Sequence, residues 1–264
     1  MAQVRIEARD RIGTIRFDNY PKRNALSKTM IAECLEAFAG FEKDGIRAVV
    51  LRSASPQKVW SAGHAVDELP EANRDPLPYD DPLEQLLRAV THFPAPVIAM
   101  VQGSAWGGAC DLVMTCDMVF GDETAAFAIT PAKIGLPYNA VGVLHFLNRL
   151  PLNIVTEMFA TAEPIEAERA LRIGLLNELV PAESLEDHVY KLAAVVATRS
   201  AEAIASFKAT ARALANASPI DPETFERIHG LRRRVYFGHD YSEGVQAFLE
   251  KRRPSFGYKP SATG

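Results

Sequence analysis

Apolar and polar residues alternate with period two near the start of the chain, in the stretches VRIEA (residues 4–8) and GTIRF (residues 13–17). Such alternation is typical of strands with one face toward a core, so the two stretches are predicted to be paired strands. Residues 27–44, SKTMIAECLEAFAGFEKD, have apolar positions at helical spacing after a serine that can cap the first turn. The run IRAVVLRSA at 46–54 then predicts a buried strand.

The middle of the chain repeats a strand, turn and helix rhythm. The turn SAGHAVDEL at 61–69 precedes a proline-rich acidic segment at 70–82, predicted to be a loop beside the site, and a helix at 83–93. The segment 95–122 predicts a strand, a glycine-rich bend, a helix and another strand. Similar patterns at 125–147 and 164–181 indicate an α/β fold with a core domain at 1–184 and a helical region at 185–264.

Composition narrows the class of protein. Apolar residues make up 48% of the 264 residues and charged residues 23%, as in a globular enzyme of the cytoplasm. The net charge of -4 argues against a nucleic-acid partner. Three cysteines without a CxxC pair predict neither a disulfide nor a zinc site. The chain has no apolar run long enough for a membrane span, so no membrane association is expected.

Several motifs in a fixed order resemble those of one family. They are NALS at 24–27, SAGHAVDEL at 61–69, GSAWGGACDL at 103–112, TPAKIGLPYN at 130–139 and DYSEGVQAFLEKRRPSF at 240–256. In these motifs the chain resembles the crotonase, or enoyl-CoA hydratase, superfamily of acyl-coenzyme A enzymes. The resemblance implies a ClpP-like spiral of ββα units, a C-terminal helical trimerisation region, and a homotrimer or dimer of trimers.

The two glycine-rich turns carry the chemistry that the resemblance implies. A reaction that builds negative charge on a thioester oxygen needs two fixed donors, and backbone amides supply them with little reorganisation. By resemblance these donors are the amides of His64 and Gly108, with Gly107 beside them. The residues alone leave simpler interpretations open, because His64 can be a structural histidine and the glycines can serve only a tight helix entry.

The chain departs from the hydratases of this family at both catalytic acids. By resemblance, Asp111 stands at the first glutamate position and Thr130 and Pro131 at the second, so addition of water is disfavoured. The implied reaction is decarboxylation of methylmalonyl-CoA to propionyl-CoA without metal or cofactor. Tyr138 is expected to hold the departing carboxylate, with Thr130 in the same pocket. Asp111 is interpreted as structural.

Coenzyme A is implied as part of the substrate. Lys22, with Arg23 beside it, and Ala25 are expected at the pantetheine and phosphates, while Ala62, Asp67 and Leu69 are expected along the adenine pocket. A solvated turn remains the alternative for the two cations. The tail LEKRRPSF at 249–256 is expected to reach the nucleotide from a neighbouring subunit.

Two other classes of function stay open. One is a different crotonase-type reaction, enoyl-CoA hydration or acyl-CoA hydrolysis, which needs an acid or base that these motifs do not supply. The other is a non-catalytic acyl-CoA-binding or RNA-binding member, for which the basic runs at 232–234 and 251–253 are the supporting feature.

Overall fold

A six-stranded sheet forms the centre of the molecule. The computed structural model describes residues 2–70, 73–217 and 221–257. In sheet order the strands are β1 (Val4–Arg9), β2 (Ile12–Phe17), β3 (Ala48–Ser53), β5 (Val97–Val101), β7 (Met118–Gly121) and β10 (Glu178–Leu179). The hairpin of β1 and β2 is antiparallel and the other pairings are parallel. The hairpin and the buried strand predicted from the sequence are therefore confirmed.

A second, smaller sheet lies beside the first. Its strands, in sheet order, are β4 (Val59–Ser61), β6 (Ser104–Trp106), β8 (Ala126–Ala128) and β9 (Ile165–Glu166). Each of β3, β5 and β7 continues along the chain into a strand of this sheet, and a helix follows before the next turn begins. This succession confirms the predicted spiral of ββα units.

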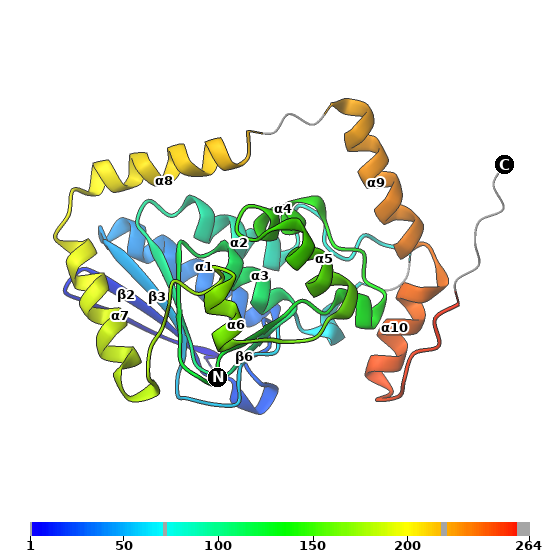
Figure 1. Cartoon of the computed structure of the whole chain (residues 1–264), viewed down its shortest axis with the longest axis horizontal. Helices are drawn as coiled ribbons and strands as arrows, with labels where there is room; N and C mark the ends of the chain where they lie inside the picture. Colours follow the sequence, from blue (N-terminus) through cyan, green and yellow to red (C-terminus); the bar gives the residue numbers. More distant parts are fainter. Residues whose placement is uncertain (1, 71–72, 218–220, 258–264) are drawn as a thin grey trace.

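Helices cover both faces of the main sheet. Side chains of β3 alternate, with Val49 and Leu51 packing toward α1 (Lys28–Lys43), α2 (Pro82–His92) and α3 (Gly108–Thr115). Val50 packs on the opposite face against α7 (Ala182–Ala197), which lies on the outer side of β2 and β3 (Figure 1). Residue 185, where the helical region was predicted to begin, falls inside α7, and the division into two domains stays a prediction.

The helices predicted after residue 185 extend away from this core. They are α8 (Ala201–Ala215), α9 (Pro222–Tyr236) and α10 (His239–Leu249), and they follow α4 (Ala140–Leu147), α5 (Leu152–Thr161) and α6 (Ala167–Arg172) along the chain. Figure 1 shows α8 running along one edge toward α9, with α10 at the end of the molecule opposite α7. Residues 218–220 and 258–264 of the predicted helical region lie outside the described residues.

Helix α10 docks on two short 3-10 helices. They are η2 (Val66–Glu68) and η3 (Pro131–Ile134), and α10 packs on both. A Cβ placed on Gly244 would lie 2.2 Å from the carbonyl oxygen of Ile134, so only glycine permits this close approach. The packing brings the end of α10 over the two turns that carry the predicted site.

Local sequence signals fix the helix starts as expected. The hydroxyl of Ser27 accepts a hydrogen bond from the amide of Met30, which confirms the predicted cap. Asp81 caps α2 in the same way and ends the predicted loop at 70–82, of which residues 71–72 lie outside the described part. None of the helices within the described ranges is long and apolar enough to cross a membrane.

Candidate active site

The turn that carries His64 is held against the first motif by backbone hydrogen bonds. The amide of Leu26 donates to the carbonyl of Gly63 (2.8 Å), and the amide of Ala65 donates to the carbonyl of Leu26 (3.4 Å). In this parallel pairing the residue between the two partners directs its own amide to the other side. The N–H of His64 therefore points away from Leu26.

The second turn places Gly108 beside that amide. Gly107 has φ +51° and its amide donates to the carbonyl of Ala128 (2.8 Å), so the chain bends sharply into α3. Gly108 is the first residue of α3, where an amide has no partner within the helix. A Cβ built on Gly108 would lie 3.3 Å from the nitrogen of His64. The two amides are therefore neighbours.

Within the described residues, neither amide donates a hydrogen bond to another part of the protein. Across the described ranges, no backbone or side-chain acceptor receives a hydrogen bond from the amides of His64 and Gly108. Gly108 also stands at the N-terminus of α3, where the helix dipole favours negative charge. Two unused donors at one point form a site for an oxyanion.

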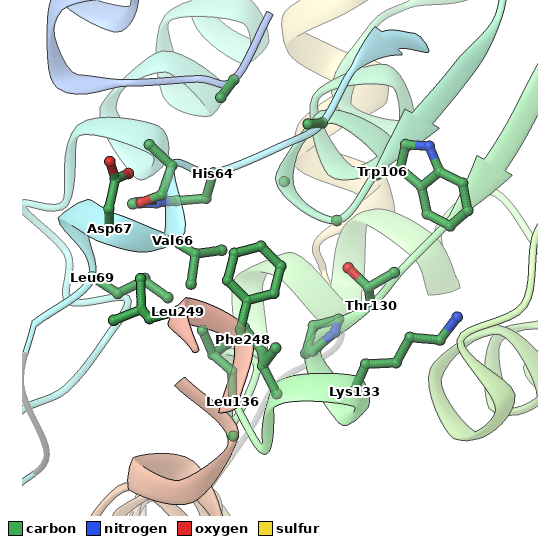
Figure 2. Close-up of a pocket in the computed structure, with 18 of the residues that line it drawn as sticks. His64, Val66, Asp67, Leu69, Trp106, Thr130, Lys133, Leu136, Phe248 and Leu249 are labelled. Atoms are coloured by element: carbon green, nitrogen blue, oxygen red, sulfur yellow. Dashed lines mark hydrogen bonds between the residues drawn. The ribbon is translucent and has the colours of Figure 1, made fainter. Parts of the chain in front are cut away.

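A cavity of about 790 Å³ opens over these amides. It brings together every site residue predicted from the sequence: Lys22, Ala25, Ala62, His64, Asp67, Leu69, Gly107, Gly108, Thr130 and Tyr138. Figure 2 shows Asp67 and Leu69 on one side of the cavity and Thr130 on the other, with His64 above. The roles assigned to these residues stay predictions.

The end of α10 and the tail that follows it also line the cavity, and Phe248 is a lining residue that the sequence analysis did not assign to the site. Phe248 and Leu249 come from the end of α10, and Figure 2 shows the ring of Phe248 between Val66 and Thr130. Lys251 and Arg252 follow on the same chain, whereas the sequence analysis expected this tail to come from a neighbouring subunit. The sequence feature that indicates the close docking of α10 is Gly244, a small residue on an amphipathic helix.

The charge of the cavity wall suits an anionic ligand. The basic lining residues are Lys22, Arg23, Lys133, Lys251 and Arg252, and among the described lining residues Asp67 is the one carboxylate. Such a wall attracts phosphate groups. Elsewhere, within the part of the chain that the structure describes, no group of three or more histidine, cysteine, aspartate or glutamate side chains has a metal-binding arrangement.

The imidazole of His64 is held by two acceptors. Its Nδ1 donates to the carbonyl of Ala65 (3.1 Å), and its Nε2 lies 3.6 Å from Oδ2 of Asp81. Burial, the largest single influence, lowers the pKa of His64, but Asp81, the carbonyl of Ala65 and the charge of Glu68 together outweigh it, so the pKa lies above its usual value. The side chain is therefore fixed at the rim while its backbone amide faces the cavity.

Tyr138, Asp111 and His145 form a hydrogen-bonded chain below the cavity floor. The Tyr138 hydroxyl donates to Oδ2 of Asp111 (2.5 Å), and Nδ1 of His145 donates to Oδ1 of the same carboxylate (2.7 Å). Asp111 is fully buried. Burial and the charge of Asp111 raise the pKa of Tyr138 well above its usual value, so the phenol keeps its proton. Asp111 is therefore paired with two neighbouring side chains, and its structural role stays a prediction.

Comparison with known proteins identifies a matching family and similar proteins that cover most of the chain. Residues 7–259 match the family Enoyl-CoA hydratase/isomerase. The chain is 43% identical over 253 residues to methylmalonyl-CoA decarboxylase of Escherichia coli (strain K12), covering 96% of this chain and 97% of that protein. It is 32% identical over 241 residues to carnitinyl-CoA dehydratase of Citrobacter koseri, covering 89% of this chain and 90% of that protein.

A solved structure extends the likeness to three dimensions. Methylmalonyl-CoA decarboxylase in complex with 2-nitronate-propionyl-CoA superposes with a TM-score of 0.94 at 42% identity, covering 97% of this chain and 98% of that one. The same enzyme has been solved with 2S-carboxypropyl-CoA, with the same score and identity. By sequence match over nearly its whole length, and by fold, this chain belongs to the enoyl-CoA hydratase/isomerase family.

Proposed function

We propose that this protein decarboxylates methylmalonyl-CoA to propionyl-CoA through an enolate. The observation that carries the proposal is the pair of neighbouring amides of His64 and Gly108, two residues that line one cavity and whose amides have no acceptor within the described residues. Loss of CO2 from a malonyl-type thioester leaves negative charge on the thioester oxygen, where the two amides stabilise it. The carbonyl group of the substrate itself takes up the electron pair, so the reaction needs no metal and no further cofactor.

The acid and base residues near the cavity support decarboxylation over hydration. Adding water across a double bond needs a base for the water and an acid for the carbon. Thr130 and Pro131 occupy the place expected for one acid, and Asp111 is buried behind Tyr138 with both oxygens engaged. The relative with 43% identity is named a methylmalonyl-CoA decarboxylase, which agrees with this choice.

The proposal predicts opposite outcomes with two thioesters. Incubated with methylmalonyl-CoA, the purified protein should release CO2 and form propionyl-CoA, because the oxyanion donors are present. Incubated with crotonyl-CoA, it should add little water, because a carboxylate pair is lacking. Chromatography of the thioesters, with a coupled assay for CO2, distinguishes the two reactions. Fast hydration of crotonyl-CoA without any decarboxylation would contradict the proposal.

Tyr138 is proposed to orient the carboxylate that leaves. Tyr138 lines the cavity, and rotation of its hydroxyl about the C–O bond would redirect the proton from Asp111 toward a bound carboxylate. A carboxylate held perpendicular to the thioester plane has its breaking bond aligned with the carbonyl π system. Tyr138 therefore contributes by orientation and retains its proton.

Tyr138→Phe is expected to lower turnover by about 10-fold or more, because the ring volume stays while the donor is lost. Binding of propionyl-CoA, which has no carboxylate, should change little. Steady-state kinetics and calorimetric titration measure the two quantities. If turnover and the affinity for propionyl-CoA fall together, Tyr138 serves packing alone, and another residue binds the carboxylate.

Coenzyme A is proposed to lie along the basic side of the cavity. Lys22, Arg23, Lys251 and Arg252 offer positive charge for its phosphates, and Ala62, Asp67 and Leu69 border the proposed adenine pocket. Arg252 is also bound by Glu243 and Glu250, which fixes the tail next to this wall. The cytoplasm remains the predicted location.

We also propose that copies of this chain assemble into a trimer or a dimer of trimers. The helices α8 and α9 expose large apolar side chains, among them Phe207 (72% exposed), Leu214 (71%) and Phe225 (51%). Apolar groups this exposed on neighbouring helices favour burial against another subunit. Sedimentation should give three or six times the chain mass of 28.9 kDa, and a monomer at micromolar concentration would contradict the assembly.

A further inference from the structure

The buried carboxylate of Asp111 accepts hydrogen bonds from two side chains that line different cavities. Asp111 accepts from Tyr138, which lines the substrate cavity, and from His145, which lines a second cavity of about 370 Å³. That second cavity lies between α4 and α8 and also includes Arg149, Lys208 and Arg212. Asp111 has no exposed surface, so Tyr138 and His145, which hydrogen-bond to its two oxygens, stabilise its charge in place of water.

This arrangement presents a difficulty for an anionic substrate. The proposed function places the carboxylate of methylmalonyl-CoA at the Tyr138 hydroxyl, which lies 2.5 Å from Asp111. If Asp111 carried an uncompensated charge, two carboxylates would compete for one proton donor and repel one another. The hydroxyl can turn to the substrate only if another group satisfies Asp111.

We infer that His145 is the positioning residue that resolves this conflict. As an imidazolium 2.7 Å from Asp111, it cancels the charge of that carboxylate and keeps one of its oxygens hydrogen-bonded. The Tyr138 hydroxyl is then free to leave Asp111 and donate to the substrate carboxylate. The inference rests on the proposed function and assigns a role to a histidine that touches no substrate.

The groups around His145 determine its protonation. Glu84 of α2 and Asp111 of α3 act as negative groups, Arg212 of α8 opposes them, and the Thr115 hydroxyl lies 3.3 Å from Nδ1. Arg149 and Lys208 line the second cavity as well, where Lys208 is paired with Asp117. Burial, the largest single influence, lowers the pKa of His145, but the charge and hydrogen bond of Asp111 and the charge of Glu84 together outweigh it, so the imidazolium persists above the usual pH of deprotonation.

Two ligands that differ by one carboxylate test the inference. The first is 2S-carboxypropyl-CoA, which carries the carboxylate and has no carbonyl at the thioester position. The second is propyl-CoA, which lacks the carboxylate. Calorimetric titration of the full chain across pH gives the ratio of the two affinities. Titration of the coenzyme A phosphates is common to both ligands and cancels in that ratio.

The ratio should depend on pH through the Asp111–His145 pair. In the wild-type protein it should fall as pH rises through the pKa of His145, because the imidazolium then loses its charge. His145→Gln has no imidazolium to lose, so it should lack this fall. At neutral pH this variant should bind the carboxylate ligand on the order of 10-fold more weakly, with propyl-CoA unchanged.

Removing the negative charge of Asp111 should make His145 unnecessary for binding the carboxylate ligand. In Asp111→Asn, the amide oxygen still accepts from Tyr138, so the ratio at neutral pH should match that of the wild type. The double variant Asp111→Asn, His145→Gln should recover the affinity lost in His145→Gln, and both should lack the pH step of the pair. A step that persists in the double variant would contradict the assignment of the pH dependence to the Asp111–His145 pair. His188→Gln, which alters a histidine paired with Glu178, should behave as the wild type.

The outcomes separate the two claims. A wild-type ratio and pH profile in His145→Gln, or no recovery in the double variant, would overturn the role of His145. If His145→Gln does not fold, Asp111→Asn decides alone, because a profile identical to the wild type would contradict the inference. Failure of the wild-type protein to release CO2 would refute the proposed function, whereas the binding ratio would still decide the role of His145.

Discussion

Replacing Gly108 by proline is expected to lower turnover of methylmalonyl-CoA by on the order of 100-fold or more, because proline has no amide hydrogen to donate to the enolate. The first position of a helix tolerates proline, since no intrahelical hydrogen bond is lost there. A Cβ at this position would lie 2.6 Å from Cδ2 of Leu83, the end of a side chain that can shift. The fold should therefore survive while one oxyanion donor is lost.

Gly108→Ala is the matched control for this variant. It introduces the same Cβ beside Leu83 and keeps the amide hydrogen. Steady-state rates of CO2 release, with circular dichroism to verify the fold, should place Gly108→Ala near the wild type and Gly108→Pro far below it. Equal activity of the two folded variants would remove Gly108 from the oxyanion site.

Gly63→Ala is expected to have a comparable effect through the position of both amides. Gly63 has φ +81°, and a Cβ there would lie 2.2 Å from the carbonyl oxygen of Trp106 and 2.9 Å from the nitrogen of Gly108. Both of these atoms belong to the backbone, so the two turns must separate. Turnover should fall by roughly 100-fold, because oxyanion donors act only at hydrogen-bond distance. The melting temperature should fall as well.

The variant Gly45→Ala distinguishes the effect of the steric clash at residue 63 from the effect of a positive φ alone. Gly45 has a similar φ of +66°, and a Cβ there would meet no atom within 4 Å. It should cost only the strain of a left-handed alanine, about 1–2 kcal/mol, without a change in turnover. Scanning calorimetry and kinetics on both variants give the comparison. Similar losses of turnover in Gly63→Ala and Gly45→Ala would mean that the contact between the two turns is not required for activity.

Much of the fold could be predicted because its signals are local. The period-two alternation at 4–8 and 13–17 predicted the hairpin, and Ser27 marked the start of α1. The glycine-rich turns could be recognised because close approach of two backbones excludes side chains, as at Gly63, and because Gly107 has a positive φ of +51°. The site residues expected from the family resemblance line one cavity, while their roles stay predictions.

The remaining features depend on contacts between distant parts of the chain. Asp111 meets Tyr138 and His145 across separations of 27 and 34 residues, and no periodic pattern encodes which side chains share a buried acid. The placement of α10 over the cavity likewise depends on how Gly244 docks against Ile134. Such partners become visible only when the helices are placed in space.

The central claim is that the reaction passes through an enolate held by the amides of His64 and Gly108. The most direct measurement is the incubation with methylmalonyl-CoA carried out in D2O, with mass spectrometry and NMR of the thioester that forms. The account predicts propionyl-CoA with one deuterium at C2, because the enolate carbon takes up a solvent-derived proton after CO2 leaves. Unchanged substrate, or free acid with coenzyme A released by hydrolysis, would contradict it.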